Sequence, residues 1–209
     1  STLVRCVSGI HPPESGEIKV NGKLVKICSP QDARDLGIET VFQDLAVIPE
    51  FDITANLFLN REALSKNPLL RLFGWLDDKS MRTNASRSLQ RLNSRIPDLS
   101  ESIKKLSGGQ RQAVAIARAV NSGADVVIMD EPTAALGVEQ SAQVNELIRL
   151  ISSQGVAVLL ISHNMQHVME TCDRAVVLLR GESIADVSIN DVSPRDLVGF
   201  ITGAQRLSA

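Results

Sequence analysis

Apolar and polar positions alternate along the C-terminal half of the chain with two different periods. Apolar residues at positions 113, 116, 117 and 120 have the spacing of one helix face, which predicts a helix from near Gly109 that ends before Gly123. A second such helix, with apolar positions 144, 147, 148 and 151, ends at Gly155. Continuous apolar runs at 125–129 and 156–161 predict buried strands on either side of this second helix. A strand, a helix and a strand in this order predict parallel α/β architecture.

The N-terminal part of the chain has a different pattern. Residues 16–28 form two short strand-like runs around Asn21 and Gly22, and Asn-Gly favours a tight hairpin because both positions take positive φ angles. The following segment, 29–37, begins with Ser-Pro, carries an aspartate in its first turn and ends with glycine, which predicts one short helix. Residues 38–42 then predict a buried strand that leads directly into a glutamine.

The segment from position 44 to about 105 lacks a continuous strand pattern and is rich in leucine, asparagine and serine, so we expect a mostly helical insertion. Five of the six aromatic residues lie in or next to this segment, at positions 42, 51, 58, 73 and 75. We interpret them as the small core of the insertion, with an exposed docking surface as the alternative. Near the C-terminus, residues 174–187 predict a final hairpin.

Composition and charge restrict the classes of function. The 209 residues are 44% hydrophobic and 22% charged, which fits one globular domain with an insertion. The net charge is −2 and the chain has no Tyr and one Trp, so nucleic acid is not an expected partner. The three cysteines stand at wide spacings, which indicates neither a disulfide framework nor a zinc site and favours a reducing compartment. The apolar runs are too short to span a bilayer.

The most specific short sequence is LSGGQ at 106–110, where a loop enters a predicted helix. A serine and two glycines at a helix N-terminus let backbone N–H groups approach an anion, and the helix dipole adds positive potential there. The pattern therefore predicts a phosphate-binding position. A capped helix start without a ligand is the alternative.

Polar residues also follow directly after the predicted strands. The sequence VVIMDEP ends a strand with Asp130 and Glu131, which suit two tasks, because one carboxylate can hold Mg²⁺ and the other can polarise an attacking water. His163 follows the next strand of the chain and can hydrogen-bond a γ-phosphate oxygen. Gln43 follows the first of these strands and can orient water or complete a Mg²⁺ shell. Each alone would be an ordinary strand-end group, but together they predict one site at one sheet edge.

The order of these sequences resembles that of the ATP-binding-cassette (ABC) ATPases, in which a Q-loop, a signature, a Walker B strand and a switch histidine follow one another. Gln43, LSGGQ, VVIMDEP and LLISH match them over essentially the whole chain. The stretches SPQDARDLGIETVFQDLAVIP, EPTAALG and LISHNMQHV resemble most the ATPase subunits of bacterial sugar importers of the fructose and ribose type. The resemblance implies an α/β P-loop NTPase fold with a parallel-sheet core. It divides the chain into a RecA-like nucleotide-binding core at 1–43 and 123–209 and a helical signature subdomain at 44–122.

The resemblance also implies a role for each matching residue. Asp130 would hold the Mg²⁺ water shell, Glu131 would be the base for hydrolysis, and His163 would sense the γ-phosphate. Gln43 would serve both catalysis and the metal site and would link them to the membrane subunit. The positions expected to contact ATP are Ser1, Thr2, Ser107, Gly108, Gly109 and Gln110. Of these, Ser1 would also be a metal ligand, and the signature residues would close over ATP held by a second cassette. ATP and Mg²⁺ are therefore the expected cofactors.

The sequence departs from the family at two places. The family's phosphate loop has the form GxxxxGK[ST], and the opening residues STL match only its end, so the loop's glycines and lysine and the strands before it are absent. We expect an N-terminally truncated cassette that binds ATP negligibly by itself, with a degenerate cassette as the alternative. Gly137 stands where most cassettes carry an aspartate, which implies altered communication across the dimer.

The expected function is the ATP-hydrolysing subunit of a bacterial sugar importer, peripheral on the cytoplasmic face of the inner membrane. Its expected partners are a second cassette, as a homodimer or in tandem, the membrane permease subunits and, indirectly, a periplasmic sugar-binding protein. A non-transport ABC ATPase and a non-catalytic interaction module are the alternatives. The stretch between Gln43 and LSGGQ has no room for the long coiled coil of chromosome-organising members.

Overall fold

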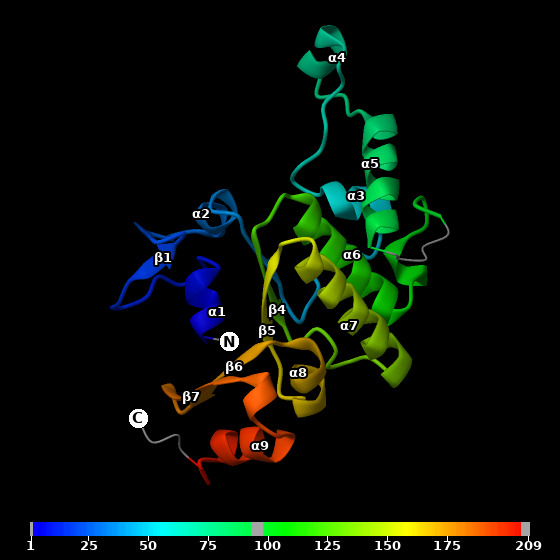
Figure 1. Ribbon diagram of the computed structural model, residues 1–209. Helices are drawn as coiled ribbons and strands as arrows, with labels where there is room; N and C mark the ends of the chain where they lie inside the picture. Colours follow the sequence, from blue (N-terminus) through cyan, green and yellow to red (C-terminus); the bar gives the residue numbers. More distant parts are fainter. Residues whose placement is uncertain (1, 93–97, 206–209) are drawn as a thin grey trace. The chain divides into compact units, whose positions relative to one another are not determined.

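The computed structural model describes residues 2–92 and 98–205 (Figure 1). The chain forms two compact units, Ser1–Leu159 and Leu160–Ala209.

The first unit begins with helix α1 (Thr2–Val7), the hairpin strands β1 (Ile18–Val20) and β2 (Lys23–Val25), and helix α2 (Pro30–Asp35). Strands β1 and β2 pair antiparallel, and the two residues between them have φ angles of 51° at Asn21 and 75° at Gly22, which confirms the predicted turn. Helix α2 begins with a capping box in which Ser29 and Asp32 each accept a hydrogen bond from the backbone of the other.

One sheet has three strands in the order β3 (Ile38–Val41), β4 (Val126–Asp130), β5 (Ala157–Ile161). Strands β3 and β4 run parallel, which confirms the predicted architecture. The three central residues of β4 are 0% exposed because neighbours cover both faces of the strand. Strand β5 lies at an edge of the described sheet and is less buried than predicted, with Leu159 43% exposed.

The insertion is helical, as predicted. Its elements are α3 (Ile53–Phe58), α4 (Pro68–Leu72), α5 (Asp78–Arg91), the 3₁₀ turn η1 (Ile103–Lys105) and α6 (Gly108–Asn121). Helix α6 is the central helix of this unit, since it packs against α3, α5, β3 and α7 (Val138–Ser153). This packing accounts for the unbroken run of buried residues from position 112 to 117 in α6.

The interpretation of the aromatic residues as the core of the insertion is wrong. The core is aliphatic and consists mainly of Ile53, Leu57, Met81, Ala85, Leu89 and Ile103. Phe51, Phe73 and Trp75 are exposed, while Phe42 and Phe58 are half-buried. Helices α3 and α5 contact each other, and none of their buried residues, Ile53, Thr54, Asn56 and Leu57 on α3 and Met81, Ala85 and Leu89 on α5, is aromatic.

The second unit contains α8 (Met165–Thr171), β6 (Arg174–Leu179), β7 (Glu182–Ser188), η2 (Ile189–Asp191) and α9 (Pro194–Thr202). Strands β6 and β7 form the predicted antiparallel hairpin, and α8 and α9 pack next to each other. Val177, Leu197 and Phe200 are among the residues of its small apolar core.

Candidate functional site

One cleft of about 410 Å³ in the first unit brings together residues from three stretches that are distant in sequence. Gln43 comes from the loop after β3, Gly108 and Arg111 from the first turn of α6, Glu131 from the loop after β4, and Lys104 from η1. Gln43 and Glu131, which the sequence predicted for one site, thus line the same cleft, together with Gly108, which the resemblance assigns to ATP held by a second cassette. This cleft is the candidate functional site.

The register of the sheet explains why Gln43 and Glu131 meet. In the parallel pair, Val41 lies opposite Met129, and each strand ends within one residue of this point. Gln43 and Glu131 both lie two residues beyond that pair, so the strands bring them to the same sheet edge. A shift of one residue in the pairing would separate them and would also turn the buried side chains of β4 to the opposite face.

Glu131 has a backbone conformation that is rare for a residue with a side chain. Its φ angle is 51°, in the left-handed region, directly after an extended strand. The carbonyl of Glu131 accepts a hydrogen bond from the N–H of Ala134 at 3.2 Å, which closes a tight turn. Such conformations cost about 1–3 kcal/mol and cluster at functional sites. The turn directs the chain away from the strand immediately after Asp130, which is half-buried at the end of β4.

The start of α6 is a complete capping box made by the signature residues themselves. The hydroxyl of Ser107 accepts from the N–H of Gln110 at 3.2 Å, and the Oε1 atom of Gln110 accepts from the N–H of Ser107 at 2.9 Å. The helix start is therefore capped, and the phosphate-binding position that the pattern predicts stays a prediction. The box satisfies only part of the N-terminal donor set of a helix, and the dipole of this 14-residue helix still favours an anion at this end.

The two glycines of the signature have a packing role that the sequence did not indicate. A Cβ atom on Gly108 would lie 2.7 Å from Cδ2 of Leu136, and a Cβ atom on Gly109 would lie 3.3 Å from Cβ of Gln140. The signature therefore packs directly on the loop after Glu131 and on the first turn of α7.

Two residues that the sequence did not single out fix the loop that follows Gln43. Arg118, on α6, donates to the carbonyls of Ala46 at 2.9 Å and Leu45 at 3.4 Å. Its pKa is lowered because its guanidinium is largely buried. Asn56 is 0% exposed and both accepts from the N–H of Ile48 at 2.7 Å and donates to its carbonyl at 3.0 Å. Neither residue belongs to a recognisable motif, so only the structure identifies them.

Gln112 is a further residue of this cleft that the sequence did not indicate. It is buried on α6 and, among the described residues, its Nε2 atom has no hydrogen-bond partner. A buried amide donor of this kind is normally satisfied by a bound water or ligand.

The other predicted site residues lie elsewhere in the described chain or outside it. Thr2 is exposed at the start of α1, and Ser1 lies outside the described residues. His163 belongs to the second unit and is exposed directly after β5, where Asn164 caps α8 by accepting from the N–H of His167 at 3.2 Å.

The donor set at the cleft suits Mg²⁺ held together with phosphate oxygens. Residues 2–92 and 98–205 contain no group of three or more His, Cys, Asp or Glu side chains that could hold a metal ion by themselves. Mg²⁺ in nucleotide sites uses one or two carboxylates and otherwise water and phosphate oxygens. Asp130, a half-buried carboxylate at the end of β4, and the amide oxygen of Gln43, which lines the cleft, are oxygen donors that Mg²⁺ accepts, so their chemistry fits the ion.

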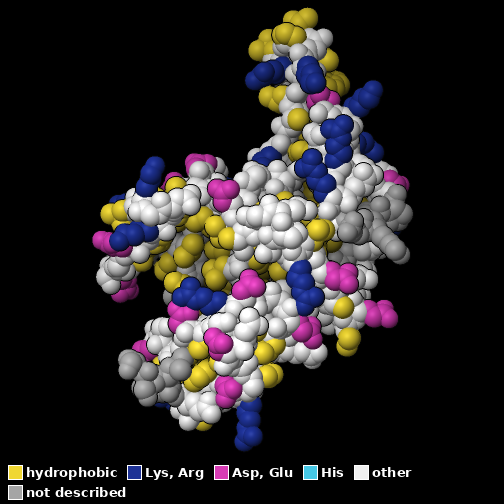
Figure 2. Space-filling model, viewed as in Figure 1, with side chains coloured by type: hydrophobic (Ala, Val, Ile, Leu, Met, Phe, Trp, Pro, Cys, Tyr) yellow, Lys and Arg dark blue, Asp and Glu magenta, His cyan; other side chains and the backbone are white. Residues whose placement is uncertain are grey.

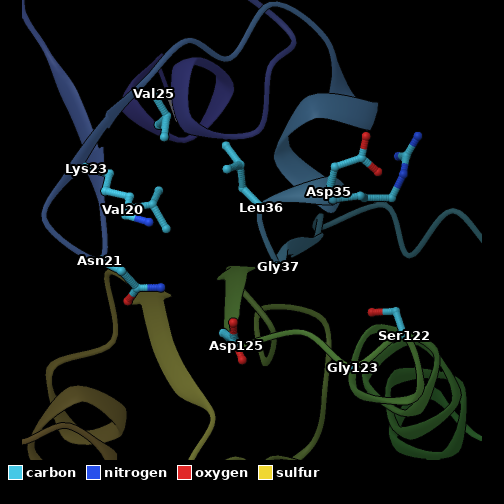
Figure 3. Close-up of a pocket in the computed structure, with 11 residues that line it drawn as sticks. Val20, Asn21, Lys23, Val25, Asp35, Leu36, Gly37, Ser122, Gly123 and Asp125 are labelled. Carbon is cyan, nitrogen blue, oxygen red and sulfur yellow. The ribbon is translucent and has the colours of Figure 1, made fainter.

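A second cavity, of about 500 Å³, lies between the β1–β2 hairpin, the end of α2 and the loop before β4 (Figure 3). Its charged residues are Lys23, Arg34, Asp35 and Asp125. None of the predicted site residues lines it, so the smaller cleft remains the candidate site.

No helix in the described part of the chain has the length and apolar character of a membrane span.

Comparisons with known proteins identify the family. The sequence profile of the family described as "ABC transporter" matches residues 1–134. The chain is 42% identical over 206 residues to the fructose import ATP-binding protein FrcA of Rhizobium meliloti, covering 98% of this chain and 79% of that protein. It is 46% identical over 202 residues to the xylose/arabinose import ATP-binding protein XylG of Sulfolobus acidocaldarius, covering 97% of this chain and 78% of that protein.

Solved structures show the same fold. The ADP conformation of an ATP-binding cassette of an ABC transporter superposes with a TM-score of 0.76 at 22% identity, over 96% of this chain and 78% of that one. A nucleotide-free ATP-binding cassette from an ABC transporter also gives 0.76, at 23% identity, over 95% of this chain and 81% of that one. The fold is thus the parallel-sheet fold of ABC cassettes, and the chain belongs to the ABC transporter family.

Proposed function

We propose that this chain is the ATP-hydrolysing subunit of a sugar ABC importer and couples ATP binding and hydrolysis to conformational change in a membrane permease. The observation that carries the proposal is the meeting of Gln43 and Glu131, from the ends of two adjacent parallel strands, in one cleft. The relatives that import fructose and xylose or arabinose support the choice of a sugar as the transported molecule.

The chemistry assigned to the site is the attack of water on the γ-phosphate of ATP. The water oxygen bonds to the γ-phosphorus, and the bond from that phosphorus to the oxygen bridging it to the β-phosphate breaks, which gives ADP and phosphate. Glu131 accepts the proton of the attacking water, and Gln43 orients that water. Asp130 and Gln43, with the hydroxyl of Ser1, would hold Mg²⁺, which when bound would neutralise charge on the phosphate oxygens. His163 donates a hydrogen bond to the γ-phosphate.

The signature residues serve a second nucleotide in this proposal. Ser107, Gly108, Gly109 and Gln110 close over ATP held by a second cassette, which is either another copy of the chain or a tandem domain. Thr2 contacts the phosphates of the chain's own ATP. Residues 44–122 form the signature subdomain, and the core comprises 1–43 and 123–209. The assembly sits on the cytoplasmic face of the inner membrane with its permease subunits and receives sugar from a periplasmic binding protein.

The affinity of the 209-residue chain itself for nucleotide follows from the same assignment. The residues STL supply a phosphate-loop hydroxyl but neither the lysine nor the glycines that cradle β- and γ-phosphates. We therefore expect no Mg-ATP binding at micromolar concentrations in isothermal titration calorimetry. A micromolar Kd on this chain would contradict that expectation, while leaving the assignment of Glu131 untouched.

The role of Glu131 is tested by Glu131→Gln in the protein assembled with its permease. Loss of the proton acceptor should lower ATP hydrolysis by on the order of 10²–10⁴-fold and abolish sugar uptake, while ATP binding by the assembly is retained. Glu146→Gln is the matched control, because Glu146 is an exposed carboxylate on α7. Unchanged uptake in Glu131→Gln would show that hydrolysis at this site is not the function and would favour a non-catalytic cassette.

A further inference from the structure

The insertion carries a protruding hairpin, residues 63–76, which we call the tip. Its two arms are joined by an antiparallel bridge between Leu64 and Leu76, and the N–H of Ser65 donates to the carbonyl of Trp75 at 2.8 Å. Helix α4 lies within the tip, and Figure 1 shows it beyond the start of α5, away from the sheet of the first unit.

The tip exposes most of its large apolar side chains. Leu72 is 80% exposed, Phe73 79%, Leu69 70% and Trp75 64%. Figure 2 shows hydrophobic side chains gathered over this end of the first unit, with basic side chains beside them. Together these side chains form an apolar patch on the order of a few hundred Å², the size that marks an interaction surface. No residue of α4 is buried, so the described chain itself does not cover the patch.

Local hydrogen bonds hold the tip in shape without burial of these side chains. Asn67 caps α4 by accepting from the N–H of Leu69 at 3.0 Å. At the other end of the helix, the N–H of Trp75 donates to the carbonyl of Leu70 at 3.0 Å. The apolar side chains are therefore displayed on a structured backbone, and a partner gains contact with them without first ordering this segment.

The charges of the tip indicate what covers it. Lys66 and Arg71 are the charged residues of the tip itself, while Glu62, Asp77 and Asp78 flank its base, where the N–H of Asp77 donates to the carbonyl of Ala63 at 2.7 Å. Leucine, phenylalanine and tryptophan next to lysine and arginine are the composition of elements that lie in the interface of a bilayer with anionic lipids. Two copies of the tip would repel each other.

We propose that the tip binds directly to the surface of an anionic phospholipid bilayer. Leu69, Leu72, Phe73 and Trp75 enter the boundary between headgroups and acyl chains, and Lys66 and Arg71 remain at the level of the phosphates. The interaction requires neither nucleotide nor permease. Its failure would therefore leave the proposed function unaffected, and the failure of that function would not affect it.

The only tryptophan of the chain provides the test, since Trp75 lies in the tip and the chain contains no tyrosine. The purified 209-residue chain is titrated with vesicles of phosphatidylcholine and phosphatidylglycerol in equal amounts, and tryptophan emission is recorded. We expect emission to shift to shorter wavelength and to be quenched by lipids with brominated acyl chains, because the indole leaves water for the acyl boundary. Vesicles of phosphatidylcholine alone should bind more weakly.

Variants separate the apolar and charged contributions. Leu72→Ser combined with Phe73→Ser should abolish the shift, whereas Lys66→Ser and Arg71→Ser should each weaken binding roughly fivefold at low salt. Leu24→Ser is the matched control because Leu24 is 64% exposed on β2 in the same unit, and it should bind as the unchanged chain does. Far-UV circular dichroism verifies that all variants remain folded.

Three results would overturn the proposal. The first is emission of Trp75 that does not change with anionic vesicles. The second is equal binding by the Leu72→Ser, Phe73→Ser variant and the Leu24→Ser control. The third is a shift that occurs without lipid and grows with protein concentration, which would assign the tip to contacts between copies of the chain.

Discussion

Replacement of Gly9 by alanine should destabilise the first unit by combining two separate costs. Gly9 lies two residues after the end of α1 and has a φ angle of 75°, a conformation that residues with a side chain rarely adopt. A Cβ atom at this position would also lie 2.2 Å from the carbonyl oxygen and 2.4 Å from the carbonyl carbon of Ser29. Both are backbone atoms of the residue that caps α2, so they cannot move without disturbing that capping box.

The size of the effect follows from a comparison with Gly22. Gly22 has the same φ angle of 75°, but a Cβ atom there would have nothing within 4 Å. Gly22→Ala should therefore lower the free energy of unfolding only by the cost of the left-handed conformation, about 1–2 kcal/mol. Gly9→Ala adds a backbone displacement in a packed region, which costs about 1–3 kcal/mol. The expected loss at Gly9 is thus about 2–5 kcal/mol.

Urea unfolding followed by far-UV circular dichroism measures both variants, with the free energy of unfolding extrapolated to water. The difference between the two variants isolates the contact of Gly9 with Ser29, because the conformational cost is common to both. If Gly9→Ala is no more destabilising than Gly22→Ala, Gly9 does not pack against the carbonyl group of Ser29 at the start of α2.

Three further outcomes follow from other contacts. Asn56→Ala should lower the free energy of unfolding by about 2–4 kcal/mol and speed amide hydrogen exchange in the loop before it, because buried backbone groups lose their partners. Gly137, the N-cap of α7, has no side-chain cap and has open space at its Cβ position. Gly137→Asp should therefore raise the free energy of unfolding by a few tenths of a kcal/mol, seen as a slightly higher thermal midpoint, and Gly137→Ala should not. Hydrogen bonds from the backbone N–H of Cys28 and the hydroxyl of Ser29 lower the pKa of Asp32 from 3.8. The stability it contributes is present above that value and is lost as pH falls through the lowered pKa, so the urea midpoint of Asp32→Asn should depend less on pH in this acidic range.

The positions of Gln43 and Glu131 could be predicted from the sequence because they depend on local patterns. Each follows a short apolar run, and parallel strands bring their carboxyl ends to one edge of the sheet. The hairpin at Asn21 and Gly22 was predictable for a similar reason, since its φ angles restrict the residues it accepts.

Other features depend on tertiary contacts that no local pattern encodes. The exposure of Phe73 and Trp75 follows from how far the tip extends beyond α5, and hydrophobic residues at these positions would have the same sequence signal if they were buried. The role of Arg118 depends on its reaching the carbonyls of a loop more than 70 positions earlier in the chain. The left-handed conformation of Glu131 could not be predicted either, because glutamate has no preference for it.

The packing of Gly108 and Gly109 against Leu136 and Gln140 forms a short mechanical link within the first unit. Leu136 belongs to the same turn region as Glu131, so a displacement of that loop is transmitted to the signature without an intervening flexible segment. Under the proposed function, Glu131 acts on the chain's own nucleotide and the signature acts on a partner's. In a dimer, the loop after Glu131 would then contact one nucleotide through Glu131 and the other through the signature. Hydrolysis of one nucleotide would affect the site of the other through the contacts of Leu136 and Gln140 with Gly108 and Gly109.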